Sequence, residues 1–484
     1  MLMHLQLDGR GPLHAQLTRA LKAMVASGVV SHGTRLPPTR LLARELGLSR
    51  NTVLAAYEQL RAEGFVDGRI GSGSYVSVPA RGLRPALRPE PKLPAQTAFM
   101  RRARSVHQQR SIPGRTIPGM RYSLQYGMPL ANPALTTAWA RALSHAALYT
   151  SPQYPGAQGL LPLRQAICDY LIRRRGIEVD PADVVIVTGT QQAVALIARV
   201  LLDVGDTVAI EEPHYYSKRV ILQSYGAVLR PIPVDGEGIV CDALPSEPPR
   251  LVCVTPSHQF PTGALLTLPR RLALLEYAQQ KGCWILEDDY DGEFRYDSKP
   301  LAALRSLDEA GRVIYVGTFS KALFPALRMG YMVVPPGLRD DFVAAKWLED
   351  FGSPAIEQTA LANFMTSGAF ERHLRLASLT LKERRAALIA GLRRIGRNWL
   401  EIADSRAGMH LAVGLRGLDR VQGDAFIARA GELGLGLFPI WPYYLSPPDR
   451  AGLLMGYGGL PVAEIEGALS ILERCLHEQY DRTG

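Results

Sequence analysis

Six strand-like runs of apolar residues, each followed by a polar or glycine-rich cluster, constrain the fold of this chain most strongly. They lie in the part of the chain from residue 121 to 484 and read DVVIVTG, TVAIEEP, RLVCVTP, CWILEDD, VIYVGTFS and YMVVPP. Their alternation with helical stretches predicts an α/β fold with a mostly parallel sheet covered by helices on both faces. Because the carboxyl ends of parallel strands meet at one edge of a sheet, we expect the clusters to line one crevice.

The first 78 residues have a different pattern, that of short helices followed by a hairpin. An amphipathic first helix is followed by one that Gly47 closes and by a third that begins at Ser49 and ends at Gly64. The third helix leaves Arg50 and Thr52 exposed at its amino-terminal end, and FVDGRIGSGSYVSV reads as two strands around a turn. This arrangement fits a helix-turn-helix with a wing, whose recognition helix enters the major groove of DNA. A protein-interaction module is the alternative.

The net charge of +10 is concentrated near the amino terminus. Residues 1–78 hold nine Lys or Arg against five Asp or Glu, residues 79–121 hold ten against one, and the remainder is slightly acidic. Basic charge confined to one part of a chain suits a segment that meets a polyanion, although a solvated basic linker explains it equally well. Residues 79–120 contain seven prolines and little apolar periodicity, so we expect an extended or mobile linker there.

Cysteine usage and hydropathy exclude several classes of protein. The five cysteines are scattered and form no CxxC pair, so reduced thiols account for them and no metal site is predicted. No apolar run approaches the ~18 residues of a membrane span, and the first residues lack the pattern of a secretory signal. We therefore expect a cytoplasmic protein of two or three domains.

The polar clusters of the larger part match together what pyridoxal phosphate (PLP) requires. A lysine must form the Schiff base with the aldehyde, and Lys321 is the candidate. A carboxylate must keep the pyridine nitrogen protonated, which suits Asp288, and Tyr290 is placed to bind the ring hydroxyl. Tyr215 is expected to cover the ring face. The other predicted cofactor contacts are Thr190, Gln191, Thr318 and Arg328 at the phosphate, together with Ser320.

The amino-terminal segment resembles the winged helix-turn-helix of GntR-type regulators. Their pattern LP-x-x-R-x-LA, a leucine–glycine turn and S-R-x-T-V is matched between Leu36 and Val53. The resemblance covers residues 1–78 and implies DNA contacts from the recognition helix, the helix before it and the wing. The residues concerned are Arg40, Ser49, Arg50, Thr52, Gly71 and Gly73.

Residues 121–484 resemble a fold-type I PLP-dependent enzyme of the aminotransferase superfamily. The most specific part of the match is S-K-x-x-x-P-x-x-R-x-G, from Ser320 to Gly330. In those enzymes a tyrosine in the position of Tyr154 reaches the phosphate of the neighbouring subunit, which implies a homodimer here.

A GntR-like reader, a linker and an aminotransferase-like domain in this order resemble the MocR subfamily of bacterial transcriptional regulators. The resemblance implies that the protein binds operator DNA and that PLP, or its imine with an amine, is a signal rather than a catalytic tool. A working aminotransferase with an attached DNA-binding domain is the alternative.

One departure from the enzyme pattern lies in the loop after the third strand-like run. Aminotransferases usually carry NPTG there, and the asparagine touches the ring oxygen of the cofactor. This chain has FPTG, so Phe260 takes that place and His258 or Gln259 is left to substitute for the asparagine.

Two further departures concern the arginines that hold an effector or substrate carboxylate. Leu454 stands where amino-acid aminotransferases place such an arginine, and Arg219 and Arg406 are the candidates to replace it. Ser217 stands near the position of an arginine in the GABA-responsive member of the subfamily. We therefore expect inefficient transamination, and PLP itself or an amine of another shape as the effector.

Overall fold

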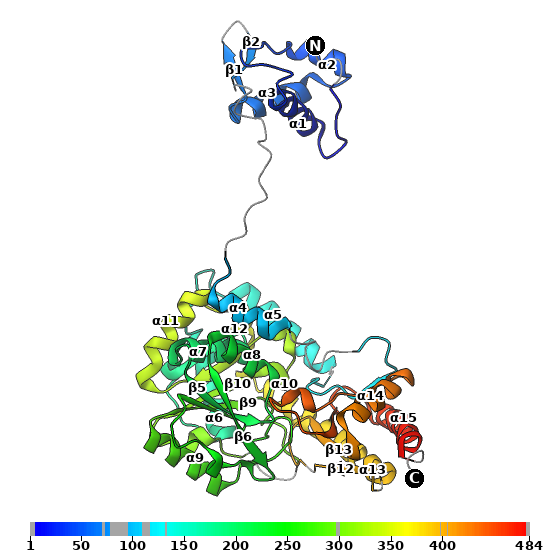
Figure 1. The fold of residues 1–484 in the computed structure, drawn as a ribbon. Helices are drawn as coiled ribbons and strands as arrows, with labels where there is room; N and C mark the ends of the chain where they lie inside the picture. Colours follow the sequence, from blue (N-terminus) through cyan, green and yellow to red (C-terminus); the bar gives the residue numbers. More distant parts are fainter. Residues whose placement is uncertain are drawn as a thin grey trace. The chain divides into compact units, whose positions relative to one another are not determined.

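The computed structural model divides the chain into two compact units, Met1–Ala95 and Gln96–Gly484. It describes residues 5–69, 73–77, 95–108, 117–130, 133–296, 301–396, 398–403 and 405–480. Figure 1 labels many of the helices and strands of both units. Within these ranges, no helix has the length and hydropathy needed to cross a membrane.

The smaller unit consists of three helices and a hairpin, as the sequence predicted. Gly47 ends the second helix with a left-handed backbone (φ 65°), and the Ser49 hydroxyl caps the third by accepting a hydrogen bond from the Thr52 amide at 3.1 Å. Leu42 and Val53 are buried between these two helices. The elements are α1 (Leu13–Ala26), α2 (Thr39–Leu46), α3 (Arg50–Ala62), β1 (Val66–Arg69) and β2 (Gly73–Val76).

An eight-stranded sheet forms the centre of the larger unit (Figure 1). Its order is β4 (Val184–Val187), β11 (Gly330–Val333), β10 (Val313–Thr318), β9 (Trp284–Asp289), β8 (Leu251–Val254), β5 (Thr207–Glu212), β6 (Val228–Asp235) and β7 (Gly238–Ile239). Only β11 and β7 run antiparallel to their neighbours. All six runs predicted from the sequence are strands of this sheet, which confirms the α/β fold.

Helices cover both faces of the sheet. Val184 and Ile186 of β4 point into one core and Val185 and Val187 into the other, as the two-residue period of a strand requires. The first core is built with α5 (Pro133–Tyr149), α6 (Leu161–Arg175), α12 (Ala355–Thr366) and α13 (Ala369–Gly396). The second is built with α7 (Thr190–Leu201), α8 (Tyr216–Tyr225) and α11 (Arg339–Asp350).

The carboxyl-terminal part adds a smaller antiparallel sheet. It contains β12 (Leu400–Ile402), β13 (His410–Asp419) and β15 (Arg450–Gly456), with β13 between the other two. The remaining named elements are α9 (Leu268–Lys281), α10 (Phe319–Ala322), α14 (Arg420–Glu432), α15 (Val462–Tyr480) and the short parallel pair β3 (Tyr122–Ser123) and β14 (Leu435–Gly436).

Part of the predicted linker is helical and belongs to the larger unit. Helix α4 (Ala98–Gln108) packs on α8: the rings of Phe99 and Tyr225 lie 5.4 Å apart, and Arg102 Nε donates a hydrogen bond to the Ser224 carbonyl at 3.0 Å. The prediction of an extended segment was wrong here. A helix this short is marginal alone, and the contacts that stabilise it come from a helix more than 100 positions later.

A buried ion pair anchors the carboxyl end of β9. Arg175 pairs with Asp289 in the core, their side chains are 2% and 4% exposed, and the Tyr315 hydroxyl donates a hydrogen bond to Asp289 Oδ2 at 2.5 Å. Removing the carboxylate with Asp289→Ala leaves a guanidinium buried without its counterion. We expect the free energy of unfolding to fall by about 3–5 kcal/mol, measured by chemical denaturation.

The control for this substitution removes a carboxylate from an exposed pair. Glu466→Ala breaks the contact of Glu466 with Arg394, where both side chains are about half exposed. This change is expected to alter stability by less than about 1 kcal/mol. A similar loss for both variants would contradict the anchoring role of Asp289.

Candidate functional site

Lys321 stands in a tight turn directly after β10. The Thr318 side chain caps α10 by accepting a hydrogen bond from the Ser320 amide at 3.2 Å, which fixes the turn. Lys321 Nζ donates a hydrogen bond to the carbonyl of Gly127 at 2.8 Å. Burial lowers the pKa of Lys321, against the opposing effect of Asp291. The amine therefore loses its proton more readily than an exposed lysine does, as a nucleophile must.

Lys321 lies in the wall of a cavity of about 230 Å³ at the carboxyl edge of the sheet. This edge is where the sequence predicted that the polar clusters would meet. All the predicted cofactor residues except His258 and Tyr154 line the cavity. They are Thr190, Gln191, Tyr215, Asp288, Tyr290, Thr318, Ser320, Lys321 and Arg328.

One end of the cavity is shaped to hold an anion. Gly189 precedes α7 with φ 109°, and Arg328 has a left-handed backbone with φ 49°. A Cβ on Gly189 would lie 3.5 Å from the guanidinium nitrogens of Arg328, so this guanidinium lies close to the amino terminus of α7. The free amides of a helix start and a guanidinium together suit a phosphate group.

One carboxylate oxygen of Asp288 has no hydrogen-bond donor among the described residues. Its side chain is buried, and Oδ2 lies 3.0 Å from Lys218 Nζ. Oδ1 is also buried, and among the described residues it has no hydrogen-bond partner. An unpaired buried carboxylate oxygen is unfavourable unless a ligand donates to it. A protonated ring nitrogen beside Asp288 meets this need, so the residues present fit a pyridinium cofactor.

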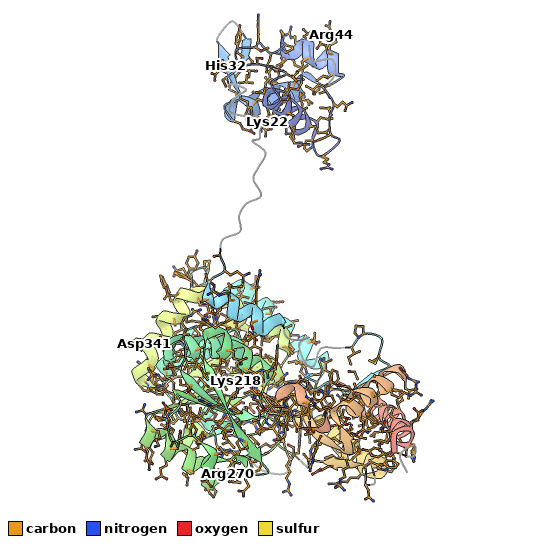
Figure 2. All side chains as sticks on the ribbon, viewed as in Figure 1. Lys22, His32, Arg44, Lys218, Arg270 and Asp341 are labelled. Atoms are coloured by element: carbon orange, nitrogen blue, oxygen red, sulfur yellow. The ribbon has the colours of Figure 1, made fainter. Side chains whose placement is uncertain are left out.

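Lys218, which is labelled in the larger unit in Figure 2, was not among the cofactor residues predicted from the sequence. Burial opposes the charged form of Lys218, but Asp288 and neighbouring acidic groups raise its pKa overall. It therefore places an ammonium group beside the Asp288 carboxyl group. Its position three residues after Tyr215, at the start of a helix, was the available signal, because residues three apart share a helix face.

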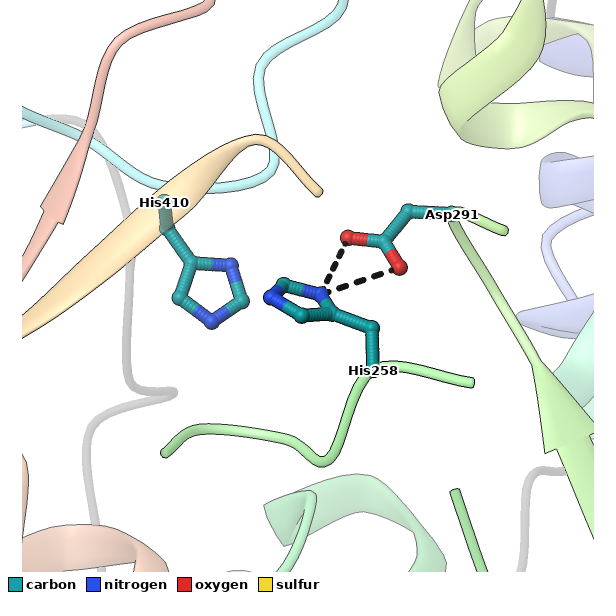
Figure 3. Close-up of side chains that lie close together, drawn as sticks. All are labelled: His258, Asp291 and His410. Atoms are coloured by element: carbon teal, nitrogen blue, oxygen red, sulfur yellow. Dashed lines mark hydrogen bonds and ion pairs between the residues drawn. The ribbon is translucent and has the colours of Figure 1, made fainter. Parts of the chain in front are cut away.

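His258 does not line the cavity but lies behind two residues that do. Its Nδ1 is 2.9 and 3.1 Å from the carboxylate oxygens of Asp291 (Figure 3) and 2.9 Å from the Tyr290 hydroxyl. The expectation that His258 replaces the missing asparagine at the ring is not supported by this position. Because Asp291 is a buried carboxylate, it needs a donor, and His258 occupies that role instead.

Gln259 lies outside the cavity as well. Its amide donates hydrogen bonds to Glu211 Oε2 at 3.2 Å and to the Pro213 carbonyl at 2.8 Å, so it braces the loop. Phe260, unlike His258 and Gln259, lines the cavity itself. The position of the enzymes' asparagine is thus apolar here.

None of the residues considered for an effector carboxylate offers a cation in the cavity. Leu454 is fully buried and packs with Phe260 and Tyr443. Neither Arg219 nor Arg406 is among the described residues that line the cavity. Arg219 instead donates a hydrogen bond to the Tyr444 carbonyl at 3.2 Å.

Tyr154 does not reach the cavity of its own chain. Its side chain is 86% exposed, and its ring lies 5.2 Å from that of Phe351. Any contact with a phosphate group therefore needs a second chain.

The predicted DNA-reading residues lie on the surface of the smaller unit. Arg40, Ser49 and Arg50 are exposed, and Thr52 is half-buried by its contact with Ser49. Gly73 is exposed at the start of β2, whereas Gly71 lies outside the described residues.

Comparisons with known proteins match both parts of the chain. The family model of aminotransferase class I and II matches residues 126–432, and that of bacterial regulatory proteins, gntR family, matches residues 13–76. A probable rhizopine catabolism regulatory protein MocR of Rhizobium meliloti is 37% identical over 475 residues, which cover 97% of this chain and 95% of that protein. The pyridoxine biosynthesis transcriptional regulator PdxR of Corynebacterium glutamicum is 31% identical over 94% of this chain and 96% of its own length.

Two of the similar solved structures are aminotransferases. LysN, an α-aminoadipate aminotransferase from Thermus thermophilus complexed with N-(5'-phosphopyridoxyl)-L-leucine, has a TM-score of 0.71 and 28% identity, over 80% of this chain and 98% of its own. A kynurenine aminotransferase from Pyrococcus horikoshii has a TM-score of 0.68 and 27% identity, over 80% and 95% of the two chains.

Proposed function

The chain belongs to the MocR-type regulators of the GntR family, which join a winged helix-turn-helix to an aminotransferase-like domain, and we propose that it is a PLP-dependent transcriptional regulator. The smaller unit binds operator DNA, and the cavity holds PLP as a Schiff base on Lys321. The observation that carries this proposal is that one cavity is lined both by Lys321 and by Asp288, whose Oδ1 has no hydrogen-bond partner among the described residues.

Several residues of the cavity wall have distinct roles in holding the cofactor. PLP supplies an aldehyde that reacts reversibly with primary amines. Lys321 would offer the amine, whose pKa burial lowers, and Asp288, paired with Lys218, would accept a hydrogen bond from the protonated pyridine nitrogen. Arg328 and the start of α7 hold the phosphate. Tyr215 covers the ring, and Tyr290, braced by His258, donates to the ring hydroxyl oxygen.

The residues of the cavity fit a role of PLP as a signal better than a role of PLP as the cofactor of transamination. Transamination of amino acids needs a group that binds the α-carboxylate, and Leu454 occupies the position of that arginine. The competing function is a working aminotransferase tethered to DNA. Keto-acid release above about 1 per second from purified protein and an amino acid would favour the enzyme.

We also propose that the protein acts as a homodimer. Tyr154, Phe351 and Trp347 are exposed aromatic residues in successive ring contact, at 5.2 and 5.4 Å between centroids. Exposed apolar surface of this kind is typical of a protein interface. In such a dimer Tyr154 extends toward the phosphate of the second chain.

Helix α8 offers a route from the cavity to the DNA-binding unit. Tyr215 directly precedes this helix, and Ser217, Lys218 and Ile221 within it line the cavity. Helix α8 also packs against α4, which in the sequence lies between the smaller unit and the rest of the larger unit. The contacts with α4 span the length of α8.

These contacts pair each end of α8 with α4. The Tyr216 hydroxyl donates to the Val106 carbonyl at 3.4 Å, and at the other end Phe99 packs on Tyr225. A shift of Tyr215 and Lys218 on cofactor binding therefore acts on the segment that leads to the DNA reader. Coupling of this kind is typically ~1–3 kcal/mol.

Phe99→Ala tests this route. The substitution removes the ring contact with Tyr225, so we expect PLP to change operator affinity by less than half as much, on a free-energy scale, as in the unsubstituted protein. The visible absorption of bound PLP is expected to stay unchanged, because Phe99 does not line the cavity. Fluorescence anisotropy with labelled operator, with and without PLP, measures the effect.

The matched control is Leu272→Ala. Leu272 is an exposed apolar residue of α9, a helix on the other face of the sheet from α8. This variant is expected to respond to PLP as the unsubstituted protein does. Full coupling in Phe99→Ala would rule out the α4–α8 contact as the route.

A further inference from the structure

The end of the cavity beside Lys321 is walled by aromatic rings. The ring of Phe260 lies 5.7 Å from Tyr126, 5.9 Å from Tyr290 and 5.5 Å from His410, and all four residues line the cavity. An amine that reaches Lys321 therefore places the rest of its body against these rings.

The charged group at this end is a carboxylate. Asp291 lines the cavity, is 2% exposed, and is bonded to the buried His258 (Figure 3). A buried acid group on the wall attracts an ammonium ion and repels another carboxylate.

The cations of the cavity are committed elsewhere. Among the described lining residues, the lysines and arginines are Lys218, Lys321 and Arg328. Lys218 is paired with Asp288 at 3.0 Å, and Arg328 lies at the phosphate end beside Gly189. Lys321 is the residue that the effector amine displaces from its imine with PLP. An effector carboxylate would thus be buried without a counterion, which is unfavourable.

The position that could supply a counterion is closed by apolar packing. Leu454 is fully buried against Phe260 and Tyr443, and the Tyr443 hydroxyl is bonded to that of Tyr126. This cluster forms the wall behind Phe260 and contributes no charge.

We propose that the effector of this protein is a primary amine without an acid group, with an uncharged body that packs on the Phe260 rings. This inference rests on the proposed Schiff base at Lys321. In the exchange, the neutral amine nitrogen of the effector would form the new C=N bond to the aldehyde-derived carbon of PLP, the C=N bond between that carbon and the Lys321 nitrogen would break, and the two protons given up by the effector nitrogen would pass to the lysine nitrogen, which leaves as a neutral amine. The step consumes no water and involves no oxidation or reduction.

The test compares matched pairs of amines on the full-length, PLP-loaded protein. The pairs are 2-phenylethylamine with L-phenylalanine, and butylamine with 4-aminobutanoate; within a pair the members differ by one carboxylate. We expect the amine without the carboxylate to half-complete the change in visible absorption at a concentration at least tenfold lower, since tenfold corresponds to about 1.4 kcal/mol. Equal or better exchange by the acid-bearing member of each pair overturns the inference, and so does absence of exchange with every amine.

A gain-of-function variant sharpens the comparison. Leu454→Arg places a cation behind Phe260. It is expected to reduce, at least threefold, the ratio of the half-completion concentrations of the two amines in each pair. The control Leu454→Met is expected to leave this ratio unchanged. The comparison on the unsubstituted protein decides the matter even if Leu454→Arg does not fold.

A wrong proposed function and a wrong effector class give different experimental results. If PLP gives no imine absorption band with the unsubstituted protein, the proposed function fails. If the band forms and amino acids exchange as readily as plain amines, the proposed function stands and only the effector class is wrong.

Discussion

Lys321→Ala is expected to abolish the visible absorption band that the PLP imine gives with the unsubstituted protein. Alanine has no amine to attack the aldehyde, and burial makes Lys321 the lysine of the cavity with the lowered pKa. PLP is still expected to bind, held by Asp288 and Arg328 without a covalent bond. Absorption spectra of both proteins after gel filtration with PLP measure the loss.

The cavity provides its own control for this prediction. Lys218 is a second buried lysine on the same wall, but it is paired with Asp288 and its pKa is raised. Lys218→Met is expected to weaken PLP binding while the imine band remains. A band that survives Lys321→Ala and disappears in Lys218→Met would reverse the assignment of the two lysines.

Arg50→Ala is expected to weaken operator binding about 5- to 150-fold, which corresponds to ~1–3 kcal/mol for one arginine at a base edge. Arg50 is exposed at the first position of α3, the end of a recognition helix that enters the major groove. PLP absorption is expected to stay intact, because Arg50 and Lys321 belong to separate units. Gel-shift titration in moderate salt gives the affinity.

Arg61→Ala is the matched control, because it removes the same charge from the other end of the same helix. It is expected to change operator affinity much less than Arg50→Ala. Equal losses in the two variants would mean that α3 contributes only general positive charge.

Sequence patterns predicted the site well where it depends on strand order. Asp288 and Thr318 lie at the carboxyl ends of β9 and β10, which are parallel neighbours, and Lys321 follows β10, so their convergence follows from topology alone. The hairpin and capped helices of the smaller unit were predictable for a similar reason, because Gly47 and Ser49 act on their own neighbours.

Other features depend on contacts between distant residues. Helix α4 is stabilised by α8, and the pairing of His258 with Asp291 depends on how two separate loops pack. No local pattern encodes either contact. Lys218 is an intermediate case, since its helical spacing from Tyr215 was visible but its burial was not. The role of Tyr154 depends on a second chain.

We propose above all that PLP bound in the Lys321 cavity changes the affinity of the smaller unit for operator DNA. The most direct test of this proposal is a titration of operator DNA with the unsubstituted protein, free of PLP and loaded with PLP, and with Lys321→Ala under both conditions. We predict that PLP changes operator affinity about 5- to 150-fold in the unsubstituted protein and clearly less in Lys321→Ala. Operator complexes of identical affinity and footprint with the pocket empty, filled or amine-exchanged would contradict the account.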